Sequence, residues 1–297
     1  MNTTSRFVPP TRIGFVGLGI MGVPLVQRFL EKGLSVTVWN LEPERFALVQ
    51  DAGAVWVDSP AAVCTTSEVV FVCVLGDDAL ASVCLGEHGF VQAKGASLLV
   101  DFSTSSPAAT LRVAAQLQEA TGLVWLDAPM SGGPQAAREG KLTLLVGGDS
   151  KVYEQAKSLL SLVSSNLTRM GGLGSGQKTK ILNQLLVGVN YVLMAELLTT
   201  AKAAGIDPHQ LPECLKGGMA DSTILQRIFP QMASGDFNPP KSYARQLNKD
   251  LKSVKVFVEN LKLELPVVAT AIQQYRNYTE AGNEMEDGAS VSRLYEE

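Results

Sequence analysis

The sequence predicts an α/β fold in two parts: a parallel-sheet domain over residues 1–172 and an all-helical domain over residues 173–297. Three observations predict this division. Short apolar runs alternate with helical stretches from Arg12 to Met170, the pattern of a mostly parallel sheet with helices on both faces. No convincing strand pattern follows Gln177. A chain of 297 residues also has room for two domains at roughly 150 residues each.

Six segments of the first part are predicted strands, and four are predicted helices. The segment 68–75 is a nearly continuous apolar run, typical of a strand buried on both faces. Helix 20–33 ends at a glycine, and helices 43–53 and 106–120 carry a proline in their first turn. The remaining strands are expected at 12–17, 35–40, 96–104, 123–130 and 141–148, and the fourth helix at 149–163.

The second part is predicted to consist of helices. Residues 177–205 form the longest of them, with apolar side chains recurring at helical spacing and Gly205 as the stop. Further helices are expected at 207–218, 223–229, 244–262 and 265–282.

The composition excludes several classes of function. Hydrophobic residues make up 46% and charged residues 18%, so the chain can bury a sizeable core. A net charge of -4 without a basic run argues against a nucleic-acid partner. Residues 181–198 are apolar but interrupted by polar side chains, and residues 1–12 lack the apolar core of a signal peptide. We therefore expect a cytoplasmic protein with no membrane partner.

Few residues could bind a metal ion. The four cysteines form no CxxC pair, and the chain has only two histidines, so no metal site is predicted. Cysteines 64, 73 and 84 lie in or beside apolar segments, and we expect free thiols there.

A glycine-rich turn follows the first predicted strand and opens the first helix. In this context Gly17-x-Gly19-x-x-Gly22 indicates a dinucleotide-binding site, since Gly17 permits the tight turn and Gly22 the packing of helix on strand. Gly19 lets the backbone approach a pyrophosphate at the positive end of the helix. The predicted cofactor-binding residues of this turn are Gly17, Leu18, Gly19, Ile20, Met21 and Gly22.

The end of the second strand gives a mixed signal on the choice of cofactor. In dinucleotide sites this position meets the adenosine ribose, where an acid accepts a hydrogen bond from the 2′-hydroxyl and basic residues suit a 2′-phosphate. Asn40 ends the strand, Glu42 follows it, and Arg45 lies one turn further on. NAD is the predicted cofactor, with NADP as the alternative.

A polar stripe runs along the start of the long helix. Lys180, Asn183 and Gln184 are spaced i, i+3 and i+4, so they share one face of a helix that is otherwise apolar. The stripe is either a solvated surface or the lining of a cleft between the domains. A lysine normally keeps its proton up to a pKa of about 10.4, and burial lowers that value, which would suit Lys180 to acid/base chemistry.

Five motifs together resemble one family, the β-hydroxyacid dehydrogenases, over nearly the whole chain: GFVGLGIMG, DFSTSSP, DAPMSGGPQAAREGKLTLLVGG, GLGSGQKTKILNQLL and NKDL. The family includes 3-hydroxyisobutyrate dehydrogenase, tartronate semialdehyde reductase, glyoxylate/succinic semialdehyde reductase and L-threonate dehydrogenase. The stretch GGMADSTIL is most similar to the tartronate semialdehyde reductases. Imine reductases share the fold but lack the lysine that stands here as Lys180.

The resemblance implies a Rossmann-type dinucleotide-binding domain, a helical domain for substrate binding and oligomerisation, and a role for each matching residue. Lys180 would be the general acid/base. Substrate contacts would come from Ser131, Gly132, Gly133, Asn183 and Gln184, and further cofactor contacts from Leu75, Gly76, Thr104 and Lys249, beside Asn40. The loop at 131–133 offers a hydroxyl and backbone N–H groups to a carboxylate, or is an ordinary glycine-rich turn.

The chain departs from the family pattern at three places. Gly76 stands where proline is frequent, Asp221 stands where glycine is frequent, and a glycine common after Ser-Gly-Gly is missing. These departures bear on the substrate more than on the reaction.

The resulting hypothesis is an NAD(P)-dependent dehydrogenase or reductase. Its small-molecule partner would be a short β-hydroxy acid or the corresponding semialdehyde, and the chain would form a homo-oligomer, either a dimer or a tetramer. The alternative is a non-enzymatic dinucleotide-sensing or scaffold protein on the same fold.

Overall fold

The computed structural model describes residues 12–296, and the chain divides into two compact units that meet at the Lys180–Ile181 bond. Each unit is described by itself. Residues 1–11 lie outside the described residues, and so does most of the segment in which the sequence predicts no signal peptide.

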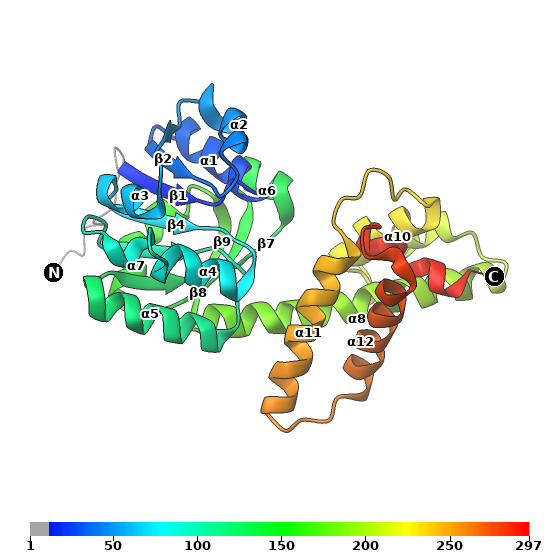
Figure 1. Ribbon diagram of the computed structural model, residues 1–297. Helices are drawn as coiled ribbons and strands as arrows, with labels where there is room; N and C mark the ends of the chain where they lie inside the picture. Colours follow the sequence, from blue (N-terminus) through cyan, green and yellow to red (C-terminus); the bar gives the residue numbers. More distant parts are fainter. Residues whose placement is uncertain (1–11, 297) are drawn as a thin grey trace. The chain divides into compact units, whose positions relative to one another are not determined.

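The first unit is built on one sheet whose strand order is β3-β2-β1-β4-β5-β6-β8-β7, with β9 paired to β8 (Figure 1). The first six strands in this order are parallel, while β8 runs antiparallel to β6 and β7 and parallel to β9. The strands are β1 (Arg12–Val16), β2 (Ser35–Trp39), β3 (Val55–Trp56), β4 (Val69–Val72), β5 (Leu98–Asp101), β6 (Val124–Asp127), β7 (Met130–Ser131), β8 (Leu142–Gly147) and β9 (Ser164–Gly171). The order reverses between β1 and β4, and in such sheets ligands bind at the carboxyl ends of the strands at this point.

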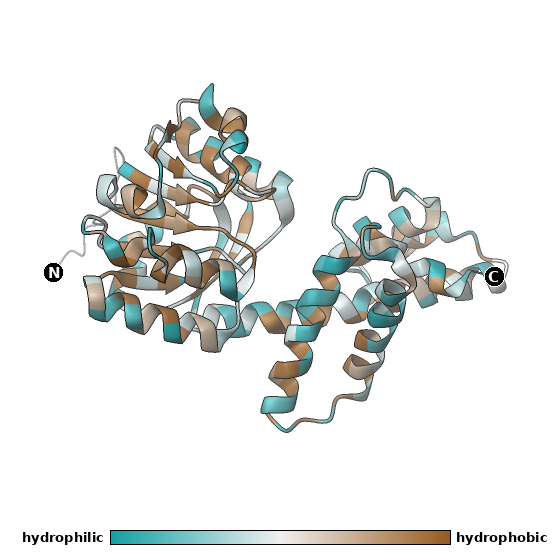
Figure 2. Cartoon of the chain, in the orientation of Figure 1, coloured by the Kyte–Doolittle hydropathy of each residue, from teal (hydrophilic) through white to brown (hydrophobic). Residues whose placement is uncertain are grey.

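Helices cover both faces of the sheet because successive residues of the buried strands point to opposite sides. Phe71 and Val100 join one hydrophobic cluster, whereas their neighbours Val72 and Leu99 join the other. Figure 2 shows these strands as brown, apolar segments. One cluster is covered by α1 (Gly22–Glu31), α2 (Ala47–Gln50), α6 (Gly133–Glu139) and α7 (Ser150–Leu160), and the other by α3 (Pro60–Thr66), α4 (Gly76–Leu85) and α5 (Pro107–Thr121).

The second unit is helical, with one isolated β-bridge among its described residues. Its core forms between the later turns of α8 (Ser175–Ala203) and the helices that follow, and Phe229, Leu251 and Tyr275 are fully buried in it. The other helices are α9 (Leu211–Leu215), α10 (Thr223–Ser234), α11 (Ala244–Asn260) and α12 (Pro266–Tyr278), with short helical turns at Pro208–Gln210, Thr279–Asn283 and Gly288–Tyr295.

Helix α8 is long and apolar enough to cross a membrane by length and composition alone, with a mean hydropathy of 1.5 in its most apolar window. Only 33% of that window is buried inside the structure. Its first turn is nevertheless bound to strand ends of the first unit, and Ala195 and Leu198 lie in the core of the second.

The predicted α/β architecture is confirmed, but several elements differ from the sequence prediction. Strand β9 was not predicted because its sequence is mostly polar and exposed and shows no apolar alternation. The predicted helix 43–53 is a 3₁₀ turn at Pro43–Phe46 followed by α2, and the predicted helix 207–218 is reduced to a 3₁₀ turn and α9. The predicted strand 123–130 is interrupted at Pro129, which has no N–H to donate to a ladder. The sequence prediction also missed β3 and helices α3, α4 and α6.

Candidate active site

The glycine-rich turn links β1 to α1 and is shaped by two close backbone contacts. Gly17 has a φ of +104°, and a Cβ atom there would lie 2.2 Å from the carbonyl oxygen of Cys73. A Cβ atom on Gly22 would lie 1.8 Å from the carbonyl oxygen of Gly17. Side chains at either position would therefore push the turn away from the sheet.

Gly19 differs from these two glycines because its open side faces no protein atom. A Cβ atom built there meets nothing within 4 Å, so a side chain would occupy free space at the start of α1. This is the space in which the predicted motif places a pyrophosphate, at the end of a helix whose dipole favours negative charge. The residues present therefore fit a dinucleotide.

The end of β2 is hydrogen-bonded to the same turn. Asn40 is 7% exposed, and its Oδ1 accepts a hydrogen bond from the backbone N–H of Leu18 at 2.7 Å. The Asn40 Nδ2 donates to the Glu42 carboxylate at 2.7 Å, and the Arg45 Nε donates to the Leu18 carbonyl. Both an acid and a base are thus held beside the turn, at the place where the sequence predicted an ambiguous choice of cofactor.

The ends of β4 and β5 are joined by Ser103. Its hydroxyl accepts a hydrogen bond from the backbone N–H of Val74 at 3.0 Å. Leu75 follows Val74 and is 82% exposed, and Gly76 has a φ of +80° with no atom within 4 Å of a built Cβ. Thr104 is half-buried in the loop after β5. The structure therefore brings together Leu75, Gly76 and Thr104, three of the predicted cofactor contacts.

Two carboxylates lie side by side at the ends of β5 and β6. Asp101 and Asp127 are paired in register and are both fully buried. Burial raises the pKa of Asp101 to about 7, against the effect of hydrogen bonds from Ser103. Burial also raises the pKa of Asp127, although N–H groups of Gln177 and Gly174 bind its charged form. Both groups bind backbone N–H groups and so shape the adjoining loops.

Asp127 fixes the beginning of α8. Its carboxylate accepts hydrogen bonds from the backbone N–H groups of Gly174 and Gln177, each at 2.8 Å. These N–H groups have no partner inside the helix, so a carboxylate here satisfies them and interacts favourably with the helix dipole. Lys180 lies one turn further along and is 8% exposed. The predicted acid/base residue is therefore a buried lysine one turn beyond the residues that Asp127 binds.

The predicted substrate loop follows β7. Ser131 pairs with Thr143 of β8 and is half-buried. Gly132 has a φ of +132° and precedes α6, while Gly133 has a φ of +76° and no atom within 4 Å of a built Cβ. The loop thus presents a hydroxyl and an open backbone.

The remaining predicted residues belong to the second unit. Gln184 and Lys249 both contact Asp250, and Asn183 is hydrogen-bonded to Gln184. The Asn183 Nδ2 donates to the Gln184 Oε1 at 2.8 Å, and the Gln184 Nε2 donates to the Asp250 Oδ2 at 2.6 Å. The Lys249 Nζ lies 3.7 Å from the other Asp250 oxygen. Lys249 also lines a cavity of about 280 Å³ together with Arg245, Asn248, Lys252, Thr279, Glu280 and Glu284.

Three residues of this arrangement were not predicted from the sequence: Asp127, Gln177 and Asp250. Each lies inside a motif that the resemblance rests on, so each was available for inspection. Asp127 was absorbed into an apolar strand, and Gln177 into the start of a helix. Their roles depend on contacts between residues about 50 positions apart, which no local pattern reveals.

Among residues 12–296, no group of three or more His, Cys, Asp and Glu side chains could hold a metal ion. The four cysteines are free, with Cys64 and Cys84 buried, Cys73 half-buried and Cys214 exposed.

Comparisons with known proteins find similar sequences and structures over nearly the whole chain. Residues 12–172 match the model of the NAD-binding domain of 6-phosphogluconate dehydrogenase, and residues 174–295 match that of the NAD-binding domain of NADP-dependent 3-hydroxyisobutyrate dehydrogenase. The chain is 37% identical to 2-hydroxy-3-oxopropionate reductase of Escherichia coli (strain K12), over 95% of this chain and 97% of the relative. It is 32% identical to 3-hydroxyisobutyrate dehydrogenase of Pseudomonas aeruginosa, over 96% and 98%. A crystal structure of 3-hydroxyisobutyrate dehydrogenase from Salmonella typhimurium superposes with a TM-score of 0.85 at 28% identity, over 96% of this chain and 99% of that one.

Proposed function

The chain belongs to the β-hydroxyacid dehydrogenase family, and from this premise we propose that its substrate is a short β-hydroxy acid or the corresponding semialdehyde. It is an NAD(P)-dependent oxidoreductase, and the family membership disfavours the scaffold alternative. The observation that carries the proposal is the buried Lys180 on a turn that Asp127 fixes to the edge of the sheet beyond β6, in the unit that carries the dinucleotide turn.

Each group has a distinct task in the proposed reaction. When bound, the nicotinamide would supply the acceptor for the hydride of the alcohol carbon in oxidation, or the hydride donor in reduction. Lys180 takes the proton from the alcohol oxygen in oxidation and donates it in reduction. The Asn183 and Gln184 carboxamides orient the substrate oxygen without competing for its proton. Ser131, Gly132 and Gly133 bind the substrate carboxylate through the hydroxyl and backbone N–H groups.

Absorbance at 340 nm tests this proposal directly. Purified protein is incubated with NADH or NADPH and a panel of short semialdehydes, and with NAD or NADP and the matching hydroxy acids. We expect turnover with at least one pair, and tartronate semialdehyde and 3-hydroxyisobutyrate are the first candidates. Failure with every pair, while the protein still binds the cofactor, would favour the sensing alternative.

We expect Ser131→Ala mainly to raise KM for the acid, by roughly 10-fold, the worth of one hydrogen bond to a charged group. The bond exists in ground and transition states alike, so kcat should change little. Steady-state kinetics of the variant measure both constants, with Ser161→Ala as a control at the end of α7, where the hydroxyl bonds only its own helix. A large fall in kcat at unchanged KM would contradict the assignment.

We propose a homo-oligomer held together by the second unit. Leu182, Leu186 and Leu193 of α8 are 51%, 62% and 50% exposed and lie along one side of the helix. Leu261, Leu263 and Val267, where the chain passes from α11 to α12, are also more than half exposed. Apolar surfaces of this extent are typical of subunit interfaces.

We expect light scattering after gel filtration to give the mass of a dimer or tetramer. The double variant Leu186→Glu/Leu193→Glu should give smaller species, because it places charges in the interface. Lys202→Glu, an exposed charge reversal near the end of the same helix, should leave the mass unchanged. A parent protein that elutes with the mass of one chain would refute the proposal. Association with detergent or lipid instead would indicate that α8 meets a membrane.

The domain limits and the location complete the proposal. We propose residues 1–172 as the dinucleotide-binding domain and 173–297 as the helical domain for substrate binding and oligomerisation. The two family matches meet between residues 172 and 174, which supports this boundary. We also propose a cytoplasmic location, in keeping with a metabolic oxidoreductase.

A further inference from the structure

We propose that Gln177 is a positioning residue that fixes the position of Lys180 relative to the loop after β5. The proposal rests on the role of Lys180 in the proposed function. Gln177 is fully buried, and its backbone N–H, Oε1 and Nε2 all form hydrogen bonds within the first unit.

The Gln177 carboxamide spans the loop that contains Thr104. Its Nε2 donates to the carbonyl oxygen of Ser103 at 2.9 Å, and its Oε1 accepts from the backbone N–H of Ser105 at 3.2 Å. Only a side chain with one donor and one acceptor at this distance from the backbone can make both bonds. The carboxamide therefore fixes the backbone on both sides of Thr104, a predicted cofactor contact.

The backbone of Gln177 fixes the first turn of α8. Its N–H binds Asp127, and a Cβ atom on the preceding Gly176 would lie only 2.2 Å from the carbonyl oxygen of Leu145. The first turn of α8 is therefore packed directly onto the strand ends. Lys180 follows at i+3 on the same side of the helix. One residue thus connects the Thr104 loop to the turn that carries Lys180.

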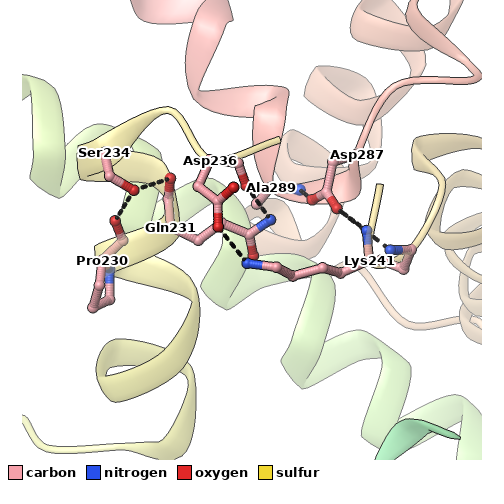
Figure 3. A network of polar contacts seen from close by, with 8 residues as sticks. Pro230, Gln231, Ser234, Asp236, Lys241, Asp287 and Ala289 are labelled. Atoms are coloured by element: carbon pink, nitrogen blue, oxygen red, sulfur yellow. Dashed lines mark hydrogen bonds and ion pairs between the residues drawn. The ribbon is translucent and has the colours of Figure 1, made fainter. Parts of the chain in front are cut away.

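This connection matters for a reaction that transfers a hydride and a proton to neighbouring atoms. A misplacement of about 1 Å can cost as much as 100-fold in rate. A buried glutamine can also serve stability alone, and Gln231 in the second unit is an example. It is 6% exposed, its Nε2 donates to the carbonyl oxygen of Asp236 at 3.0 Å, and it lies in the network drawn in Figure 3.

The first experiment replaces each glutamine by a side chain of similar length that cannot form these bonds. We expect Gln177→Met to lower kcat by roughly 10- to 50-fold, with little change in KM for the cofactor, since the phosphates bind at Gly17–Gly22. Gln231→Met should lower the melting temperature without lowering kcat. The proposal is wrong if Gln177→Met keeps the parent kcat. It is also wrong if both variants lose kcat in proportion to the fall in their melting temperatures.

A double-mutant cycle with Lys180→Ala separates this proposal from the proposed function. If Gln177 acts through Lys180, Gln177→Met should have little further effect on kcat in the Lys180→Ala background. A full additional loss in that background would overturn the positioning role, even though the role of Lys180 would stand. A Lys180→Ala variant with parent turnover would instead refute the proposed function.

A second variant adds a signature that a purely structural role would not produce. In Gln177→Glu, a protonated carboxyl can still donate to Ser103 and accept from Ser105, whereas the carboxylate can only accept. We expect the ratio of its kcat to the parent kcat to be highest at low pH and to fall at least several-fold as the introduced group loses its proton. A ratio that stays constant from pH 5 to 9, measured well below the melting temperature, would overturn the proposal.

Discussion

Lys180→Ala is expected to lower turnover by roughly 10²- to 10⁴-fold, the usual contribution of a positioned acid/base group. Lys180 is 8% exposed, and its backbone lies one turn beyond the hydrogen bonds to Asp127, which fix the start of the helix. The dissociation constant of the cofactor should change little, because phosphate binding belongs to the turn between β1 and α1. Initial rates at saturating substrate, and cofactor titration by fluorescence, measure the two effects separately.

The matched control is Lys178→Ala. Lys178 is exposed and occupies the same turn of α8. Its replacement removes one positive charge from this turn, as Lys180→Ala does, but away from the proposed chemistry. It should keep the parent turnover. Near-normal turnover of Lys180→Ala, or equal losses in both variants, would remove Lys180 from the catalytic role.

The sequence predicts the architecture well where burial dictates the pattern. The segment 68–75 sits between two neighbouring strands and under helices on both faces, so every residue of β4 had to be apolar. The polar strand β9 lies beyond this rule. It is held by its backbone ladder to β8 while most of its side chains face solvent, and backbone hydrogen bonds produce no apolar pattern in the sequence.

The sequence indicates the residues proposed to take part in the reaction better than it indicates the residues that hold them in position. The residues with a recognisable reaction role stand in motifs: the glycine turn, Ser131 and Lys180. The residues that hold them act through distant partners. Gln177 binds a loop 72 and 74 positions away in sequence, and Gln184 binds Asp250 over 66 positions. Such pairs are set by the tertiary fold, so spacing along the chain cannot indicate them.

The choice between the two dinucleotides is the other expected result with a large effect: NAD should be preferred over NADP by about 10- to 100-fold in kcat/KM. An unfavourable contact of about 1–3 kcal/mol between Glu42 and a 2′-phosphate would produce this ratio. Asn40 holds the Glu42 carboxylate at 2.7 Å, beside the turn proposed to bind the pyrophosphate. There the acid repels a phosphate and can accept a hydrogen bond from a 2′-hydroxyl.

Two features oppose this preference and make the measurement decisive. Asn40 is an amide at the position where an acid would favour a 2′-hydroxyl, and Arg45 lies close enough to bond the Leu18 carbonyl through Nε. Its two terminal nitrogens could then turn to a phosphate. Leu41 is 75% exposed and cannot donate a hydrogen bond. An arginine at this position would place a hydrogen-bond donor beside a 2′-phosphate.

The experiment compares kcat/KM for both cofactors in the parent and in Leu41→Arg, at one fixed substrate concentration. Leu48→Arg adds the same charge at another exposed leucine nearby, on α2, and serves as the control. If the parent prefers NAD and only Leu41→Arg reduces the ratio of kcat/KM for NAD to kcat/KM for NADP, the charge of the residue directly after Asn40 determines the cofactor preference. If the parent already prefers NADP, Arg45 binds the phosphate and the repulsion assigned to Glu42 is wrong. In that event Arg45→Ala should weaken the binding of NADP more than that of NAD, because only NADP carries the 2′-phosphate that the guanidinium would bind.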